Sequence, residues 1–278
     1  MNLFEVDALI KKAFDEDLGL AGDITTENIF NSDEKSYGKF VAKSDGVCCG
    51  LNIVKRVYEL YDTDVNFITN IKDGDYYTKG TIIAEVRGKT ISLLICERIA
   101  LNFLQHLSGI STSTQKLVIS LGRKDVKICD TRKTIPGLRQ LQKYAVKTGG
   151  GYNHRLGLFD AVMLKENHIH AAGGIVNAVN IIRKKIGHTV KIEVETTNLV
   201  EVGHALEAQV DIIMLDNMDY VIMEKACKLI DGKALIEVSG NITPENIKER
   251  IGTLPINIVS SGYITHSVKA ADISFLFS

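Results

Sequence analysis

The chain has 278 residues, of which 45% are hydrophobic, and its 33 Lys and Arg nearly balance its 34 Asp and Glu. This length allows one large domain or two smaller ones, and a near-neutral charge without a long basic run gives no reason to expect nucleic acid or a membrane surface as a partner. No apolar stretch approaches the roughly 20 residues of a membrane-spanning helix, and the acidic N-terminal segment does not resemble a signal peptide.

The first part of the chain, residues 1–110, predicts a layer of mixed helices and strands. The segment 73–86 resembles a hairpin turn flanked by strand, and a long helical stretch at 95–111 leads toward the second part. The alternating apolar tail, within residues 266–278, is expected to return as a strand to the first part. The other expected elements are strands at 37–47, 64–71 and 81–86 and a helix at 52–61.

The second part, residues 111–265, predicts a TIM-like α/β barrel of six or seven strands. Short apolar runs rich in β-branched residues alternate with segments of helical period, which is typical of parallel strands covered by helices. Their return spacing of about 20–35 residues favours a barrel over an open sheet, and no Gly-x-Gly-x-x-Gly follows the first run. The runs lie at 126–129, 161–164, 191–194, 211–215, 234–238 and 256–259.

Polar residues follow every one of these runs. In a parallel barrel all strand ends meet at the C-terminal rim, where such barrels place their chemistry. One polar residue after a strand is ordinary loop composition, but the whole set predicts a functional rim. Its members are Asp130, Lys165, Glu195, Asp216, Ser239 and Ser260-Ser261.

Two segments carry clustered cations. Arg132 and Lys133 follow the first run, and Pro136-Gly137 then open a helix, so side chains and helix-start amides together predict an anion site. A solvated basic turn is the alternative. Three glycines at 149–151 allow a ligand to approach the backbone, and His154 and Arg155 come directly after them.

The last two strands are followed by small residues. Ser239-Gly240-Asn241 precedes a helix start at Thr243, and Ser260-Ser261-Gly262 follows the final run. Such loops form the usual phosphate cradle of a barrel, and a purely structural turn and cap is the alternative.

Two further sets of side chains suggest metal binding. Glu195 and Asp216 stand on neighbouring strand ends beside the phosphate site, a pattern that suits Mg²⁺, although they could instead balance Lys165 or bind ribose hydroxyls. His168 and His170 have a spacing that suits a transition metal, but no third ligand lies nearby in the sequence.

The five cysteines, at positions 48, 49, 96, 129 and 227, form no CxxC motif. Their odd number and wide spacing favour reduced thiols and a cytoplasmic location. Cys129 lies inside an apolar run, which predicts a small buried hydrophobe rather than a nucleophile.

The assembled segments resemble the quinolinate phosphoribosyltransferases, also called carboxylating nicotinate-nucleotide pyrophosphorylases. The most specific similarity is the block at 130–169, DTRKTIPGLRQLQKYAVKTGGGYNHRLGLFDAVMLKENHI. The resemblance covers nearly the whole chain, since shorter segments match in order. They are EDLGLAGDITT, ERIALNFLQHLSGIST, IEVETTN, IIMLDNM, EVSGNI and SSGYITHSVKAADIS.

This resemblance implies a type II phosphoribosyltransferase with an N-terminal α/β sandwich, a C-terminal α/β barrel and a homodimer or higher homo-oligomer. The implied reaction joins quinolinate to phosphoribosyl pyrophosphate and yields nicotinate mononucleotide, pyrophosphate and CO₂ for NAD biosynthesis. Mg²⁺ is expected with the phosphoribosyl pyrophosphate, and no organic prosthetic group is expected.

The resemblance also implies a role for each matching residue. Glu195 and Asp216 would hold the ribose or the Mg²⁺-pyrophosphate end. The residues that would surround the two carboxylates of quinolinate, with Arg98 from the adjacent subunit, are Arg98, Arg132, Lys133, His154, Arg155 and Lys165. The residues that would cradle the 5′-phosphate are Ser239, Gly240, Asn241, Ser261 and Gly262. Ser260-Ser261 and Asn241 depart from the small apolar residues and glycine that are common there.

Three other functions stay open at this point. A Schiff-base lyase would use Lys165 as its nucleophile on a phosphate-binding barrel, but it leaves the other cations unexplained. A biotinyl or lipoyl carrier would need a lysine at a tight hairpin tip, whereas Lys79 lies in a longer connection. A related phosphoribosyltransferase with another aromatic acid as acceptor would keep the same fold.

Overall fold

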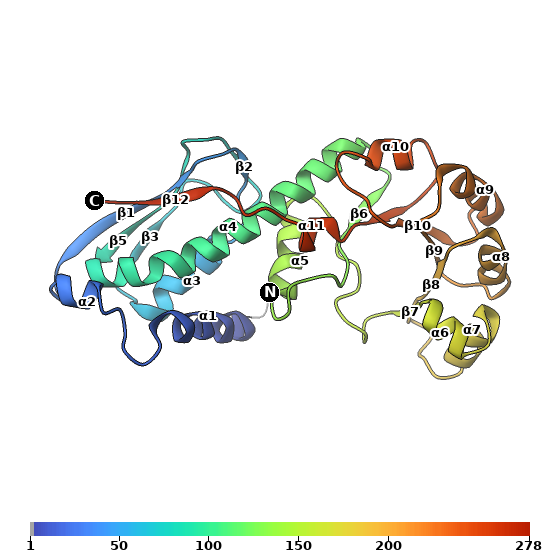
Figure 1. Ribbon diagram of the computed structural model, residues 1–278, viewed down its shortest axis with the longest axis horizontal. Coiled ribbons are helices and arrows are strands. Elements are labelled where there is room, and N and C mark those ends of the chain that lie inside the picture. The colour runs from blue at the N-terminus through green and yellow to red at the C-terminus, as the bar shows by residue number, and fades with distance from the viewer. Residues whose placement is uncertain (1–2) are drawn as a thin grey trace. The chain divides into compact units, whose positions relative to one another are not determined.

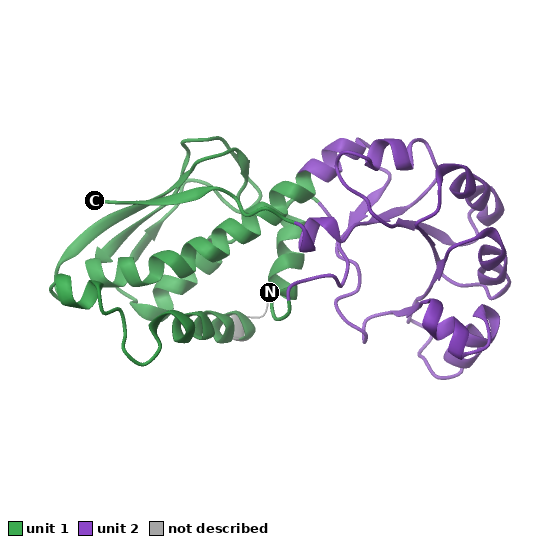
Figure 2. Cartoon of the chain, in the orientation of Figure 1, with its two compact units in different colours: residues 1–115, 136–150, 268–278 green, residues 116–135, 151–267 purple. Residues whose placement is uncertain are grey.

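The computed structural model describes residues 3–278, and the chain forms two compact units (Figure 2). Unit 1 comprises the chain up to Gln115 together with Pro136–Gly150 and Val268–Ser278, and unit 2 comprises Lys116–Ile135 and Gly151–Ser267. The expected boundary between residues 110 and 111 differs from this division mainly because Pro136–Gly150 belongs to unit 1.

Unit 1 contains a four-stranded antiparallel sheet in the order β12-β1-β5-β3. The tail strand β12 (Ile273–Phe277) pairs with β1 (Lys35–Ala42), which places Phe275 opposite Phe40 with their ring centroids 5.0 Å apart. The ring centroid of Phe40 also lies 6.5 Å from that of Tyr58 in α3, so this helix packs against the sheet. The other elements of unit 1 are α1 (Leu3–Leu18), α2 (Thr26–Ile29), β2 (Gly46–Val47), α3 (Leu51–Tyr61), β3 (Asn66–Ile68), β4 (Tyr76–Tyr77), β5 (Ile82–Lys89), α5 (Arg139–Thr148) and α4 (Thr90–Leu121), which continues into unit 2.

The hairpin predicted at 73–86 is wrong. β4 pairs with β2, whereas β5 pairs with β1 and β3. Because both edges of β5 are already hydrogen-bonded, no edge remains for β4. The strand predicted over 37–47 is likewise two strands, β1 and β2, interrupted at residues 43–45.

Helix α5 joins unit 1 through side-chain hydrogen bonds. The Tyr144 hydroxyl donates to Asp73 at 2.7 Å, and the Ser111 hydroxyl donates to the carbonyl of Ala145 at 2.7 Å. Gln142 and His106 are also hydrogen-bonded, at 2.8 Å. The first turn of α5 therefore belongs to unit 1, and the contribution of its amides to an anion site stays a prediction.

Unit 2 contains a six-stranded parallel sheet in the order β6-β11-β10-β9-β8-β7. The sheet curves into a TIM-like barrel with the helices on its outside (Figure 1), which confirms the predicted fold class with six strands. Its elements are β6 (Lys127–Cys129), β7 (Val162–Leu164), α6 (Glu166–Ala171), α7 (Ile175–Arg183), β8 (Ile192–Thr196), α8 (Leu199–Glu207), β9 (Ile212–Asp216), α9 (Tyr220–Ile230), β10 (Leu235–Ser239), α10 (Ile247–Ile251), β11 (Ile258–Ser260) and α11 (Tyr263–His266).

Side-chain caps begin two of the outer helices. Asn198 accepts a hydrogen bond from the backbone N–H of Glu201 at the start of α8, and Asp219 does the same for Ile222 in α9. The helix predicted to start at Thr243 begins later, at Ile247, because the N–H of Thr243 donates to the Asn246 side chain in a preceding turn. In the described part of the chain, no helix is both long and apolar enough to cross a membrane.

Candidate active site

A cavity of about 740 Å³ opens at the carboxyl ends of the barrel strands. Both cation segments and both late loops reach it, together with side chains from the strands between them. Its lining comprises Thr131, Arg132, Lys133, His154, Arg155, Met163, Lys165, Glu195, Met214, Asp216, Asn217, Glu237, Ser239, Gly240, Asn241, Ile242, Thr243, Ser260, Ser261, Gly262, Tyr263, His266 and Ser267.

The four strands β7 to β10 present two sets of inward side chains. Alternate residues of a strand share a face, so the residue at each strand end lies above the one two positions earlier. We call the four strand-end residues the rim set: Lys165, Glu195, Asp216 and Ser239. We call the residues beneath them the inner set: Met163, Glu193, Met214 and Glu237. All of the rim set and all of the inner set except Glu193 line the cavity.

The loop after β6 holds Arg132 and Lys133 at the cavity. The hydroxyl of Thr265 donates to the carbonyl of Lys133 at 2.7 Å, and the N–H of Lys133 donates to the Thr131 hydroxyl at 3.0 Å. A side chain on Gly262 would come within 2.9 Å of the aliphatic chain of Lys133, so glycine leaves room for that lysine. Both cations are exposed on the cavity side of this fixed loop.

The segment after the three glycines places His154 and Arg155 beside this loop. Tyr152 forms a parallel bridge with Cys129, and the N–H of His154 donates to Asp130 at 2.9 Å. The guanidinium of Arg155 donates to the carbonyl of Ala161 at 3.1 Å. Burial and the neighbouring charge of Arg132 lower the pKa of Arg155 from its ordinary value.

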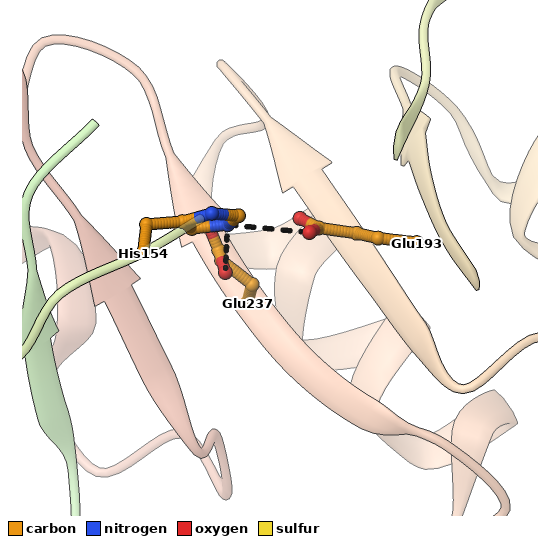
Figure 3. Close-up of side chains that lie close together, drawn as sticks. All are labelled: His154, Glu193 and Glu237. Atoms are coloured by element: carbon orange, nitrogen blue, oxygen red, sulfur yellow. Dashed lines mark ion pairs between the residues drawn. The ribbon is translucent and has the colours of Figure 1, made fainter. Parts of the chain in front are cut away.

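His154 is held between two buried carboxylates (Figure 3). Its Nε2 lies 3.2 Å from Glu193 of β8 and 3.3 Å from Glu237 of β10. Burial by itself would lower the pKa of His154, but the two carboxylates outweigh burial and raise it from about 6.5 to about 10. Burial raises the pKa of Glu193, while the hydrogen bond with His154 opposes that effect.

These three side chains also have the donor types of a metal site, with ligand atoms within 4.8 Å of one another. However, Nδ1 of His154 accepts the backbone N–H of Arg155 at 2.8 Å, which assigns the proton of the neutral ring to Nε2. A protonated Nε2 is a hydrogen-bond donor to Glu193 and Glu237 and not a metal ligand. The structure therefore favours a hydrogen-bonded cluster.

The remaining charges of the rim set are partly paired. Lys165 forms an ion pair with Glu195 on the neighbouring strand. Asp216 accepts a hydrogen bond from the side chain of Asn217 at 2.8 Å. Glu195 and Asp216 end adjacent strands and both line the cavity, so their oxygens provide the hard, anionic donors that Mg²⁺ prefers.

The two late loops form one connected structure. The hydroxyl of Ser261 donates to the carbonyl of Ile242 at 2.7 Å, and its N–H donates to the carbonyl of Cys129 at 3.0 Å. Gly240 has φ of +106°, and a side chain there would come within 2.2 Å of Asn217, so only glycine fits. Within residues 3–278, the backbone N–H groups of Gly240, Asn241 and Gly262 donate to no protein acceptor, which leaves them for an anion in the cavity.

Of the predicted site residues, all but one line this cavity. Arg98 is exposed on α4 in unit 1. Ser261 lines the cavity, but its N–H and hydroxyl bond to the protein, so it joins the loops rather than offering free donors. His168 accepts the N–H of Lys165 at 3.1 Å, and no metal cluster among the described residues includes it or His170.

The sequence analysis did not identify Glu193, Glu237 and Asn217. The available signal for the glutamates is a charge inside an otherwise apolar strand, two residues before a rim residue, as in Glu193-Val194-Glu195 and Glu237-Val238-Ser239. Asn217 has φ of +52°, a backbone conformation that asparagine tolerates better than most residues.

Comparisons with known proteins agree over the whole chain. Residues 23–108 match the family model for the N-terminal domain of quinolinate phosphoribosyl transferase, and residues 110–276 match the model for its C-terminal domain. A probable nicotinate-nucleotide pyrophosphorylase [carboxylating] of Bacillus subtilis is 44% identical over 99% of this chain and 94% of its own length. A chloroplastic counterpart of Arabidopsis thaliana is 40% identical over 98% and 82%.

Solved structures give the same result. The crystal structure of NadC from Streptococcus pyogenes covers 100% of this chain and 99% of its own, with a TM-score of 0.95 and 44% identity. The nicotinate-nucleotide pyrophosphorylase of Francisella tularensis covers 100% and 98%, with a TM-score of 0.93 and 37% identity.

Proposed function

The chain belongs to the quinolinate phosphoribosyltransferase family, and from this premise we propose how its barrel cavity carries out the reaction of that family. The enzyme transfers the phosphoribosyl group of phosphoribosyl pyrophosphate to quinolinate and releases pyrophosphate and CO₂, which yields nicotinate mononucleotide for NAD biosynthesis. The observation that carries this proposal is the meeting of the two cation segments, the two rim carboxylates and the free loop amides in one cavity.

The cations bind the acceptor. Quinolinate has two adjacent carboxylates on a planar ring, and guanidinium groups pair with carboxylates through two parallel hydrogen bonds. Arg132 and Arg155 provide such groups, and Lys133, Lys165 and His154 add charge around them. Lys165 would exchange its pairing with Glu195 for one with the substrate.

The late loops bind the donor. The free N–H groups of Gly240, Asn241 and Gly262 suit the 5′-phosphate, because backbone amides contact phosphate oxygens without a side chain between them. Glu195 and Asp216 suit the ribose hydroxyls or a Mg²⁺ ion that accompanies the pyrophosphate. When bound there, Mg²⁺ would neutralise charge on the leaving pyrophosphate.

Positioning and charge placement supply the catalysis. The pyridine nitrogen attacks C1 of the ribose as the bond to pyrophosphate breaks, so the protein must hold these atoms in line. The anionic rim carboxylates favour the positive charge that develops on the ribose. The 2-carboxylate then leaves as CO₂, its electron pair stays on C2 beside the cationic ring nitrogen, and C2 takes up a proton.

A Schiff-base lyase is a weaker candidate on this geometry. Lys165 is paired with Glu195, and a lyase that uses Lys165 as its nucleophile leaves Arg132, Lys133 and Arg155 in the same cavity without a role. Borohydride trapping with a sugar phosphate tests this alternative, and we expect no covalent adduct.

The assembly and location belong to the same proposal. We place Arg98 in the site of a second copy of the chain, so that a homodimer has two shared sites. Arg98 is exposed on α4, which leaves its guanidinium accessible to another subunit. The five cysteines are free and buried, which supports a reducing compartment, the cytoplasm.

The decisive experiment is incubation with quinolinate, phosphoribosyl pyrophosphate and Mg²⁺. We expect nicotinate mononucleotide, pyrophosphate and CO₂ in equal amounts. Nicotinate should be used with a kcat/KM lower by about 1000-fold, because its missing carboxylate leaves cations of the cavity without their partner. Comparable kcat/KM for the two acids would refute the acceptor assignment.

A further inference from the structure

We propose that Asn217 is a positioning residue for phosphoribosyl pyrophosphate, because it links the carboxylate of Asp216 to the late loop that carries the free amides of Gly240 and Asn241. The inference rests on the proposed function for the identity of the donor substrate. The link itself is a feature of the enzyme before any substrate binds.

Asn217 holds the start of the late loop in place beside Asp216. Its side-chain Nδ2 donates to Oδ2 of Asp216 at 2.8 Å, and its backbone N–H donates to the carbonyl of Ser239 at 3.1 Å. Asp216 and Ser239 are partners in the register of β9 and β10, so the backbone contact continues this pairing one residue past the strand ends. The loop therefore begins at a fixed distance from the Asp216 carboxylate.

The side chain of Asn217 also packs against the loop itself. Its Oδ1 lies against the backbone of Gly240, because a Cβ at that glycine would be only 2.2 Å from this oxygen. The side chain of Asn241 donates to the same Oδ1 at 3.5 Å, and the carbonyl of Asn241 accepts from the side chain of Asn246 at 2.8 Å. The free amides of the loop are thus held between Asn217 on one side and Asn246 on the other.

Two properties of this position favour asparagine. The backbone of Asn217 has φ of +52°, which asparagine and glycine adopt more readily than most residues. The amide also supplies a donor and an acceptor at the end of one short side chain. Glycine would keep only the backbone conformation, and aspartate would replace the donor by a second negative charge beside Asp216.

The link matters because phosphoribosyl pyrophosphate must reach both parts of the donor site at once. In the proposed function, its 5′-phosphate binds to the loop amides while its ribose or Mg²⁺-pyrophosphate end binds at Glu195 and Asp216. A change in the spacing of these two parts would weaken binding of the donor. Arg132 and Arg155 belong to other segments of the cavity, so binding of the acceptor does not depend on this link.

The first test measures binding of phosphoribosyl pyrophosphate with Mg²⁺ to the whole enzyme by titration calorimetry. Asn217→Gly should raise the Kd about tenfold or more, because Asp216 loses a hydrogen bond to its charged group. The KM for quinolinate should stay within about threefold of wild type. Thermal unfolding of the same preparation establishes that the variant is folded.

Gln209→Gly is the matched control for this change. Gln209 also has φ of +52°, but it is exposed and precedes the amino end of β9, at the opposite end of the strand from the cavity. The control should leave both the Kd for phosphoribosyl pyrophosphate and the KM for quinolinate unchanged.

A second test uses Asn217→Asp, which has the same shape but lacks the donor. At about pH 8 two carboxylates would face each other, and the Kd for phosphoribosyl pyrophosphate should rise about tenfold or more relative to wild type. At about pH 5.5 the two carboxyl groups can share a proton, which restores a donor, so the difference from wild type should shrink. A merely structural defect would not be relieved by acid.

A third test separates positioning from direct contact with the substrate. If Asn217 acts by linking Asp216 to the loop, Asn217→Gly should weaken donor binding by less than about threefold further in an Asp216→Ala background. If Asn217 binds the donor directly, the loss in this background should be as large as in the wild type.

Two results would overturn the inference while the proposed function stands. One is a folded Asn217→Gly protein that binds phosphoribosyl pyrophosphate as tightly as wild type, and the other is the same loss in both backgrounds of the third test. A wild-type enzyme that does not bind phosphoribosyl pyrophosphate would refute the proposed function and the inference together. An enzyme that binds it with the predicted dependence on Asn217 but does not use quinolinate would refute only the choice of acceptor.

Discussion

The rim set and the inner set of the barrel come from the same four strands and differ by two positions in each. Lys165, Glu195, Asp216 and Ser239 are exposed or half-buried, and they follow the ends of apolar runs. In the inner set, Glu193, Met214 and Glu237 are buried. The rim residues have cavity and solvent on one side and are available to substrate. The inner glutamates instead form ion pairs with His154. Proximity to a substrate cavity therefore does not by itself make a charged residue a substrate ligand.

The largest effect on activity should come from a change at Arg132, in the loop after β6. Arg132→Lys should lower kcat/KM for quinolinate by at least about 100-fold, because an ammonium group cannot reproduce the two parallel hydrogen bonds of a guanidinium. Stability should change by less than about 0.5 kcal/mol, since Arg132 is exposed. Steady-state kinetics and thermal unfolding measure both.

Arg183→Lys on the exposed end of α7 is the matched control for this change and should retain full activity. Near-normal activity of Arg132→Lys would mean that Arg132 is a solvated surface cation.

The second largest effect should come from changes at Arg98 and Lys165, if Arg98 of one chain acts in the active site of the other. Arg98→Ala and Lys165→Ala should each be nearly inactive as homodimers. When the two are unfolded and refolded together, both changes can fall in one site of a mixed dimer, which leaves the other site complete. Random pairing makes half the dimers mixed, so activity should recover to roughly a quarter of wild type. A mixture that contains verified mixed dimers and stays inactive would show that Arg98 acts within its own chain.

A smaller effect, on thermal stability, should come from the contact between His154 and the glutamates of the inner set. The pKa of His154 is raised from about 6.5 to about 10, although burial alone would lower it. A raised pKa means that the folded state binds the proton more tightly, so this contribution is fully present below about pH 6.5 and is lost as pH rises toward 10. The difference in Tm between wild type and His154→Gln should therefore narrow over this interval. A difference that widens with pH would contradict the assignment of the charges.

The smallest effect should come from the buried thiol at the end of β6. Cys129 is 6% exposed, so Cys129→Ala should cost on the order of 1 kcal/mol of stability and leave turnover per folded enzyme within about twofold of wild type. Activity and unfolding measured on the same preparation test both parts. A folded but inactive protein would reopen thiol chemistry.

Several features of this protein were determined by its sequence alone. The six apolar runs predicted all six barrel strands, because strands covered by helices must be apolar over their length. The polar residues after them predicted the rim, because parallel strands all end at one side of a barrel. The tail pattern predicted the strand β12. These predictions succeeded because each depends on local periodicity or on a rule that applies to every parallel barrel.

Other features were decided only by the tertiary structure. β4 looks like half of a hairpin in sequence, but β5 had no free edge to accept it. Thr243 looks like a helix start, but the Asn246 side chain binds its N–H and delays α10. His154 and the two glutamates are 39 or more residues apart along the chain, and only the barrel brings their side chains within hydrogen-bonding distance. A sequence pattern predicts which face of a helix or strand a residue lies on. Pairing between residues far apart in the sequence depends instead on which strand edges and hydrogen-bonding groups are already paired in the fold.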